Sequence, residues 1–205
     1  MLEIHVDAFA NSSVGVICDG QRVYASNFGT NPAEVLESLQ RMLPSTVAFR
    51  VSPKPSVFAK RALSVIRDIC EGKEAVEILP LALERFPTYR QRVLRAVSQI
   101  PVGYVASYGG VADAAGGGAR AVGNAMATNC LAPLVPCHRV VTSNLGLGGY
   151  GGGLKVKYDF LVREKRGYAE SHEVIFEGRV LRVFPVEFVL RRLEKFASKG
   201  MFQSL

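Results

Sequence analysis

The sequence has few cysteines and no long apolar run. Four of the 205 residues are cysteine, and no two of them form a Cys-x-x-Cys pair, which argues against a zinc ribbon and against a disulfide scaffold. A zinc site built from Cys18, Cys70 and His5 has no support in their spacing, so buried thiols are expected there. No apolar segment approaches the ~18 residues that a membrane-spanning helix needs.

The start of the chain also lacks the pattern of a signal peptide. MLEIHVDAFANSS contains no basic segment followed by an apolar core, so the expected location is the cytoplasm, or the nucleus if the source is a eukaryote. Lys and Arg outnumber Asp and Glu by 25 to 18. This basic balance fits a polyanionic partner such as nucleic acid, although it does not identify one by itself.

Residues 1–85 are expected to form a small α/β scaffold domain. Alternating apolar residues on both sides of Asp19-Gly20 predict a β-hairpin. Asn31-Pro32 predicts a helix start, because asparagine caps a first turn and proline fits the first helical position. A second helix is expected from about Ser56 to Cys70, and a strand within residues 74–83. This part of the chain contains no catalytic constellation.

A domain boundary is expected at Phe86-Pro87-Thr88, and the residues beyond it predict a DNA-binding fold. Ser107 can cap a helix over about 108–115, three glycines then break it, and Ala119–Ala127 form a second helix. Helix, short glycine turn and helix is the outline of a helix-turn-helix. The second helix carries Arg120 and a series of small residues. Tight helix packing is the competing explanation for those small side chains.

A glycine-rich loop over residues 144–153 surrounds Tyr150 and precedes a helix expected over about Leu154–Arg166. The loop lacks the Lys-Ser/Thr ending of a phosphate-binding loop, so it does not predict a nucleotide site. Its glycines favour close approach of the backbone to a ligand. A loop that is only flexible is the alternative.

Residues 168–205 form a distinct C-terminal extension. Apolar residues on both sides of Glu177-Gly178-Arg179 predict a hairpin, and the spacing of apolar residues over Val186–Ser198 predicts an amphipathic helix. The helix is expected to pack onto the body of the protein.

Pro136-Cys137-His138-Arg139 is the sharpest chemical signal. A cysteine attacks as the thiolate, and an ordinary thiol with a pKa of ~8.5 is little ionised near neutrality. A neighbouring base or positive charge must therefore activate it. His138 could be that base, with Glu164 as the carboxylate that orients it in a triad. A Cys-His pair alone is more often structural than catalytic.

Several motifs in combination resemble those of the O6-alkylguanine-DNA alkyltransferases. Val-Pro-Cys-His-Arg-Val is similar to the active-site motif of that family, and the resemblance extends over about residues 88–167. The matching positions are residues 100–108 at the entry to the helix-turn-helix, residues 119–126 in its recognition helix, Asn129, residues 135–140, residues 149–154, Lys157 and Glu164.

The resemblance implies both a fold and a reaction. The fold is a ribonuclease-H-like α/β domain at 1–85, followed at 86–167 by a mostly α, winged-helix-like domain with the helix-turn-helix and the alkyl acceptor. Residues 168–205 are not covered. The reaction is DNA repair by direct reversal: the protein flips O6-alkylguanine out of duplex DNA and transfers the alkyl group irreversibly to its own cysteine, once per molecule.

The resemblance also assigns roles to individual residues. Cys137 is the nucleophile and final acceptor, His138 acts through water as its base, Glu164 orients His138, and Asn129 braces the turn before the active-site strand. Arg120 enters the duplex, while Tyr108 crowds a phosphate and reaches the flipped base. The residues implied to bind the DNA or the base are Tyr108, Ala119, Arg120, Gly123, Val140, Tyr150, Gly151, Gly152 and Lys157.

The implied partner is double-stranded DNA bound through its minor groove, with no metal, no organic cofactor and a monomeric protein. Departures from the family are Gly151, where some members have serine, and Gly118, where alanine is common. Three alternatives remain: a lesion sensor of the same fold, which would lack the acceptor cysteine; a helix-turn-helix protein with an inert Cys137; and a cysteine hydrolase.

Overall fold

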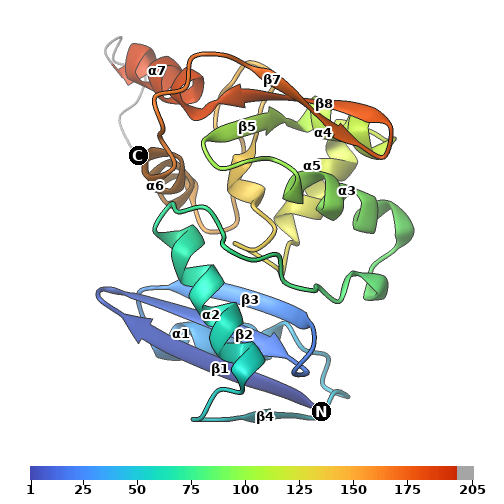
Figure 1. The fold of residues 1–205 in the computed structure, drawn as a ribbon, viewed down its shortest axis with the longest axis vertical. Helices are drawn as coiled ribbons and strands as arrows, with labels where there is room; N and C mark the ends of the chain where they lie inside the picture. The colour runs from blue at the N-terminus through green and yellow to red at the C-terminus, as the bar shows by residue number, and fades with distance from the viewer. Residues whose placement is uncertain (198–205) are drawn as a thin grey trace. The chain divides into compact units, whose positions relative to one another are not determined.

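The structure is a computed structural model that describes residues 1–197, and its chain divides into two compact units (Figure 1). The first unit contains residues 1–85 together with residues 130–134, and the second contains residues 86–129 and the chain from 135 onward. The segment 130–134 therefore departs from the prediction, which placed it in the second domain. Ser26 accounts for this, because its backbone N–H donates to Cys130 O and its hydroxyl donates to Ala132 O.

A four-stranded sheet in the order β3-β2-β1-β4 forms the base of the first unit. The first three strands are antiparallel neighbours, and β4 runs parallel to β1. The hairpin predicted at Asp19-Gly20 is confirmed, with Gly20 at φ +90° in the turn. The strands are β1 Leu2–Phe9, β2 Ser12–Cys18, β3 Val23–Gly29 and β4 Phe49–Val51.

Both helices predicted in the first unit are confirmed. The first, α1 (Pro32–Arg41), is capped by Asn31, whose side chain accepts from Ala33 N. The second, α2 (Val57–Cys70), is capped by Ser56. Cys18 and Cys70 are buried thiols outside any disulfide, as expected.

The strand predicted within residues 74–83 is wrong. Val76 and Ile78 show the alternation typical of a strand, but their exposed fractions are 90% and 96%. Within this segment, Leu81 makes a single bridge, to Val23. Beyond this contact with the first residue of β3, the segment forms no strand, and a short 3-10 helix, η1 (Leu83–Arg85), follows.

The second unit contains the predicted helix-turn-helix. After α3 (Thr88–Ser98), the strand β5 (Tyr104–Ser107) leads into α4 (Tyr108–Ala115) and α5 (Ala119–Ala127). Ser107 caps α4 by accepting from Gly110 N, and Gly116 ends it at φ +75°. This left-handed conformation is the one that glycine adopts without steric cost, so the turn between the helices follows from the local sequence.

A second sheet, in the order β6-β5-β8-β7, crosses the second unit. The predicted C-terminal hairpin and helix are confirmed, although Ser198 lies outside the described residues. The predicted helix after the glycine loop ends at Arg163 rather than Arg166, with Glu164 as its C-cap. The remaining elements are η2 Cys137–Arg139, β6 Val140–Val141, α6 Leu154–Arg163, β7 His172–Phe176, β8 Arg179–Pro185 and α7 Val186–Ala197.

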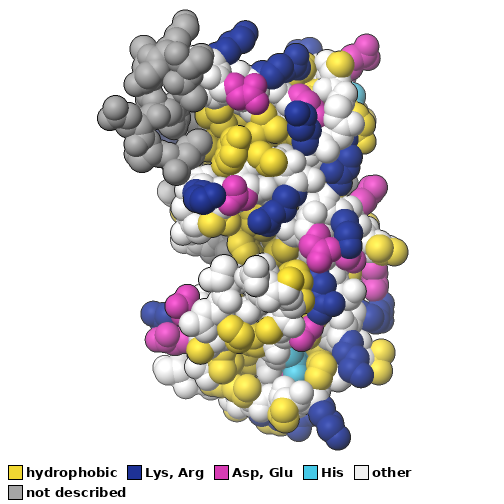
Figure 2. Space-filling view, turned by 90° about the vertical axis from the view of Figure 1, so that its left-hand side faces the viewer, with side chains coloured by type: hydrophobic (Ala, Val, Ile, Leu, Met, Phe, Trp, Pro, Cys, Tyr) yellow, Lys and Arg dark blue, Asp and Glu magenta, His cyan; other side chains and the backbone are white. Residues whose placement is uncertain are grey.

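Among residues 1–197, no helix is long and apolar enough to cross a membrane. On the face drawn in Figure 2, Lys and Arg side chains are interspersed with acidic and apolar ones. The positive net charge therefore does not by itself mark a binding surface on this face.

Candidate functional site

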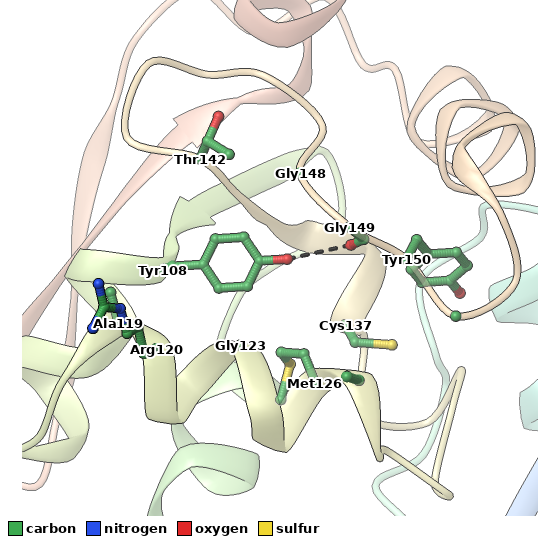
Figure 3. Close-up of a pocket in the computed structure, with 12 residues that line it drawn as sticks. Tyr108, Ala119, Arg120, Gly123, Met126, Cys137, Thr142, Gly148, Gly149 and Tyr150 are labelled. Carbon is green, nitrogen blue, oxygen red and sulfur yellow. Dashed lines mark hydrogen bonds between the residues drawn. The ribbon is translucent and has the colours of Figure 1, made fainter.

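Cys137 lines a cavity of about 620 Å³ in the second unit (Figure 3). One wall is the exposed side of α5, another is Tyr108 at the start of α4, and a third is the glycine-rich loop around Tyr150. The residues that line it are Tyr108, Ala119, Arg120, Gly123, Met126, Ala127, Cys137, Thr142, Gly148, Gly149, Tyr150 and Gly151.

Local hydrogen bonds hold Cys137 in the short helix η2. Its N–H donates to Val135 O, and Arg139 N–H donates to Pro136 O, which closes the turn. The side-chain amide of Asn129 donates to Val135 O at 2.9 Å. Asn129 thus joins the end of α5 to the residues before the cysteine. Cys137 is only 7% exposed.

Burial raises the pKa of the Cys137 thiol above its ordinary value, while hydrogen bonds from Asn129 and Tyr150 and the positive charge of Lys157 act against that rise. The net direction is upward, so the resting thiol is protonated near neutrality. A buried neutral thiol is a poor nucleophile, and a base must therefore take its proton before it can react.

Next to the cysteine, His138 is fully buried and pairs with Glu164. His138 Nε2 and Glu164 Oε1 are 2.8 Å apart. Burial lowers the pKa of His138, although Glu164 opposes this effect, and the ring is neutral near pH 7. Because an ionised carboxylate only accepts hydrogen bonds, the proton of the neutral ring lies on Nε2. Nδ1 then keeps a lone pair, and it has no hydrogen-bonding partner among residues 1–197.

Arg139 is a member of this group that the sequence analysis did not single out, although it stands within the quoted motif. Its guanidinium Nε and Nη2 donate to Glu164 at distances of 2.8 to 3.1 Å, and Nη1 donates to Ile100 O at 2.7 Å. Burial would raise the pKa of Glu164, but His138 and Arg139 lower it to about 2. Glu164 is therefore ionised, and its two neighbours satisfy the buried charge.

Tyr108 crosses the cavity toward the glycine-rich loop. Its hydroxyl donates to Gly149 O at 3.3 Å (Figure 3). Burial, followed by the nearby Cys137, raises the pKa of Tyr108. The phenol therefore stays protonated at neutral pH and can donate a hydrogen bond to a molecule in the cavity.

On α5, Ala119 and Arg120 are exposed and Gly123 is partly buried, and all three line the cavity. A Cβ added to Gly123 would meet no atom of the described residues within 4 Å. Tight packing inside the chain therefore does not explain the glycine. A small residue pointing into open space at the rim of a cavity is instead consistent with close approach of a ligand.

Lys157 and Val140 were expected to bind DNA or the base, but neither lines the cavity. Lys157 is fully buried, and its ammonium donates to Val140 O and Leu147 O at 2.5 Å each. Burial lowers the pKa of Lys157 to about 8, although Cys137 opposes the shift. Lys157 thus supplies positive charge beneath the site and ties β6 to the loop.

Gly152 also lies outside the cavity lining, and an added Cβ there would lie 3.1 Å from the Tyr150 ring. The sequence analysis missed five lining residues: Met126, Ala127, Thr142, Gly148 and Gly149. Met126 and Ala127 continue the predicted recognition helix, so helical periodicity could have indicated them. Thr142 had no sequence signal, because the fold of the loop brings it to the cavity.

The fold and the site define a helix-turn-helix protein with a buried cysteine beside the second helix of that motif. Residues 88–166 match the sequence model of the 6-O-methylguanine DNA methyltransferase, DNA binding domain. The chain belongs to this family. An O6-methylguanine methyltransferase variant from M. tuberculosis, solved by crystallography, has 30% sequence identity and a TM-score of 0.64, with 83% of this chain and 97% of that one covered.

Further relatives agree with this assignment. The crystal structure of Mycobacterium tuberculosis OGT in complex with DNA has 29% identity and a TM-score of 0.64, covering 80% of this chain and 92% of that one. A methylated-DNA–protein-cysteine methyltransferase from Methanothermobacter thermautotrophicus is 37% identical over 111 residues, or 54% of this chain. One from Mycolicibacterium paratuberculosis is 48% identical over 80 residues, or 38% of this chain. The matches span 63% and 48% of those two proteins.

Proposed function

We propose that this protein repairs DNA by direct reversal, as a methylated-DNA–protein-cysteine methyltransferase that takes the alkyl group of O6-alkylguanine onto Cys137. The observation that carries the proposal is the cysteine within a cavity bounded by the second helix of a helix-turn-helix, with a buried His138–Glu164 pair beside it. A nucleophile and a DNA-binding helix that border the same cavity are what such a reaction requires.

His138 acts as the base for the thiol. Its protonated Nε2 is held by Glu164, so Nδ1 is the atom that can accept a proton. A water molecule between Nδ1 and Sγ would complete the path. As the proton moves to the ring, Glu164 stabilises the resulting imidazolium, and Lys157 stabilises the thiolate. Cys137, His138 and Glu164 thus have the roles of nucleophile, general base and orienting carboxylate, as in other catalytic triads.

Alkyl transfer is an in-line displacement at carbon. The thiolate Sγ forms a bond to the alkyl carbon, the bond between that carbon and guanine O6 breaks, and its electron pair stays on the base. The protonated Tyr108 hydroxyl donates toward the departing base as it gains charge. The proton lost by the thiol is balanced by the one that the guanine gains. The thioether product is not readily cleaved, so each molecule acts once.

DNA binds through α5 in the minor groove. Ala119 and Gly123 leave room for close contact, and Arg120 is exposed at the start of the helix, where it can fill the space of a flipped base. Flipping costs a few kcal/mol, and an inserted side chain offsets part of that cost. We expect a monomer in the cytoplasm, or in the nucleus of a eukaryote.

The finer fold assignments support the same proposal. The order β3-β2-β1-β4, with β4 parallel to β1 and helices after β3 and β4, fits a ribonuclease-H-like first domain. The helices α4 and α5 fit a winged-helix-like second domain, and the β7–β8 hairpin that pairs with β5 through β8 comes from residues 168–205, outside the predicted limits of that domain. The functional domain limits 1–85, 86–167 and 168–205 remain predictions, and residues 130–134 group with the first unit.

The test is the intact mass of the protein after incubation with a duplex that contains O6-methylguanine. One methyl group should appear on the wild type, map to Cys137 and be missing from Cys137→Ser. An unmodified duplex of the same sequence is the matched control. Binding without any gain in mass would favour a lesion sensor or a plain helix-turn-helix protein, and turnover of an activated ester would favour a hydrolase.

A further inference from the structure

The C-terminal extension is part of the core of the second unit. Strand β8 pairs with β5 through Tyr104–Pro185 and Val105–Phe184. The helix α7 buries Val189, Leu190 and Leu193. Both β8 and α7 follow the segment 88–166 that matches the family, whereas β5 lies within it. The extension therefore contributes packing that the family segment alone does not supply.

The loop that walls the cavity needs such support. It contains glycine at 146, 148, 149, 151, 152 and 153, and ordering a glycine-rich backbone has a large entropic cost. Leu147 is the loop's buried apolar anchor and is 5% exposed. Its carbonyl also accepts from Lys157. The position of the loop thus depends on what buries Leu147.

Half of the apolar cluster that contains Leu147 comes from α7. Leu147 belongs to one apolar cluster with Val105, Val141, Leu161, Val186, Val189, Leu190 and Leu193. Leu147 and Leu193 also line the same groove, together with Gly148. Four of the eight members of this cluster lie on α7, so α7 and the loop residue Leu147 share one apolar cluster.

The next two residues of the loop touch the site. A Cβ on Gly148, which has φ +68°, would lie 3.0 Å from Tyr108 Cε2, and Gly149 O accepts from the Tyr108 hydroxyl (Figure 3). A shift of Leu147 would therefore reach Tyr108 within two residues. Small misplacements of a reacting geometry are costly, since about 1 Å can reduce a rate by about a hundredfold.

We infer that α7 is a positioning element of the site, and that Leu193 in particular holds the loop 144–150 against Tyr108 by burying Leu147. The alkyl-acceptor cavity of this protein then depends on a C-terminal extension outside the matched family segment. The expected effect on the rate of methyl transfer rests on the proposed function. The expected effect of Leu193 on the position of the loop does not depend on it.

The experiment compares Leu193→Ala with Leu181→Ala in the full chain. Leu181 is fully buried in the same extension but lies outside the Leu147 cluster. Leu181→Ala therefore removes the same buried side-chain atoms as Leu193→Ala without touching that cluster, and it serves as the control. Amide hydrogen exchange of residues 145–151 and the single-turnover rate of methyl transfer from an O6-methylguanine duplex are measured for both. Leu193→Ala should raise exchange in the loop and slow transfer about tenfold or more.

Leu181→Ala should lower stability with loop exchange unchanged and transfer within about twofold of the wild type. Leu193→Met, which keeps the volume, should restore both readouts. If Leu193→Ala does not fold, Leu193→Val and Leu181→Val give the same comparison with a smaller loss. Equal effects of the two positions, or unchanged loop exchange in the Leu193 variant, would overturn the inference. If the wild type transfers no methyl group, the proposed function fails, while the exchange comparison still decides the role of α7.

Discussion

The carboxylate of Glu164 accepts hydrogen bonds from His138 Nε2, at 2.8 Å, and from the guanidinium of Arg139. The carboxylate and the imidazole are both fully buried. One negative charge thus fixes the tautomer of the proposed base and neutralises a buried cation. The same contacts make stability and reactivity depend on one residue.

Replacing Glu164 by glutamine should destabilise the protein strongly. The variant keeps the shape of the side chain but leaves Arg139 as an uncompensated buried charge, which costs about 3–5 kcal/mol. Chemical denaturation followed by circular dichroism measures the change. Glu173 is exposed, so Glu173→Gln makes the same chemical change at the surface and serves as the control. A Glu164→Gln variant as stable as that control would contradict the interpretation.

Acid should destabilise the wild type in two overlapping ranges. The folded-state pKa of Glu164 is about 2, below its ordinary value of 4.5, so its contribution to stability is present above pH 4.5 and is lost as the pH falls toward 2. The pKa of His138 is also lowered, from 6.5, so its contribution begins to be lost below pH 6.5. Denaturation midpoints measured from pH 7 to pH 3 should fall steadily. A midpoint that rises on acidification would be inconsistent with a neutral buried His138.

Replacing His138 by alanine should slow methyl transfer with little effect on DNA affinity. A positioned general base typically contributes about 10²–10⁴-fold, and His138 is buried away from the exposed side of α5. Single-turnover kinetics and binding to the unmodified duplex give the two values. If transfer proceeds at the wild-type rate, a group other than His138 takes the thiol proton.

The variant Tyr108→Phe tests what the hydroxyl of Tyr108 contributes to methyl transfer. It removes the hydrogen bond to Gly149 O and the proposed donor to the base, but it keeps the ring that lines the cavity. Transfer should slow by about 10- to 100-fold, which is the value of a hydrogen bond to a group that gains charge. The rate with O6-methylguanine duplex is the measurement. An unchanged rate would leave Tyr108 with a steric role only.

Substitutions at Gly123 should affect the stability of the protein and its binding to DNA differently. Because an added Cβ meets open space, Gly123→Ala should stabilise the helix by about 0.5–1 kcal/mol. Gly123→Leu should also fold normally but should weaken binding to duplex DNA, since the larger side chain blocks close approach of α5. Thermal unfolding and fluorescence anisotropy distinguish the two effects. A Leu variant that binds as tightly as the wild type would show that DNA does not approach this position.

Much of the local structure was determined by the sequence. Asn31 and Ser56 cap helices, Asp19-Gly20 forms a hairpin turn, and Gly116 ends α4. These features depend on a few adjacent residues, so their physical cause lies within reach of the local pattern. The motif around Cys137 likewise predicted the chemistry that we propose, because the residues that resemble the family's active-site motif lie in one short segment.

Only the tertiary structure decided which distant groups meet. The strand expected at 74–83 was wrong because alternation cannot supply a pairing partner. Lys157 was expected to bind DNA or the base, yet it is buried beneath the loop, where the carbonyl groups of Val140 and Leu147 satisfy its charge. Arg139 meets Glu164, and α7 meets Leu147, through packing between segments far apart in sequence. Such contacts depend on the burial of whole elements, which no local pattern of residues encodes.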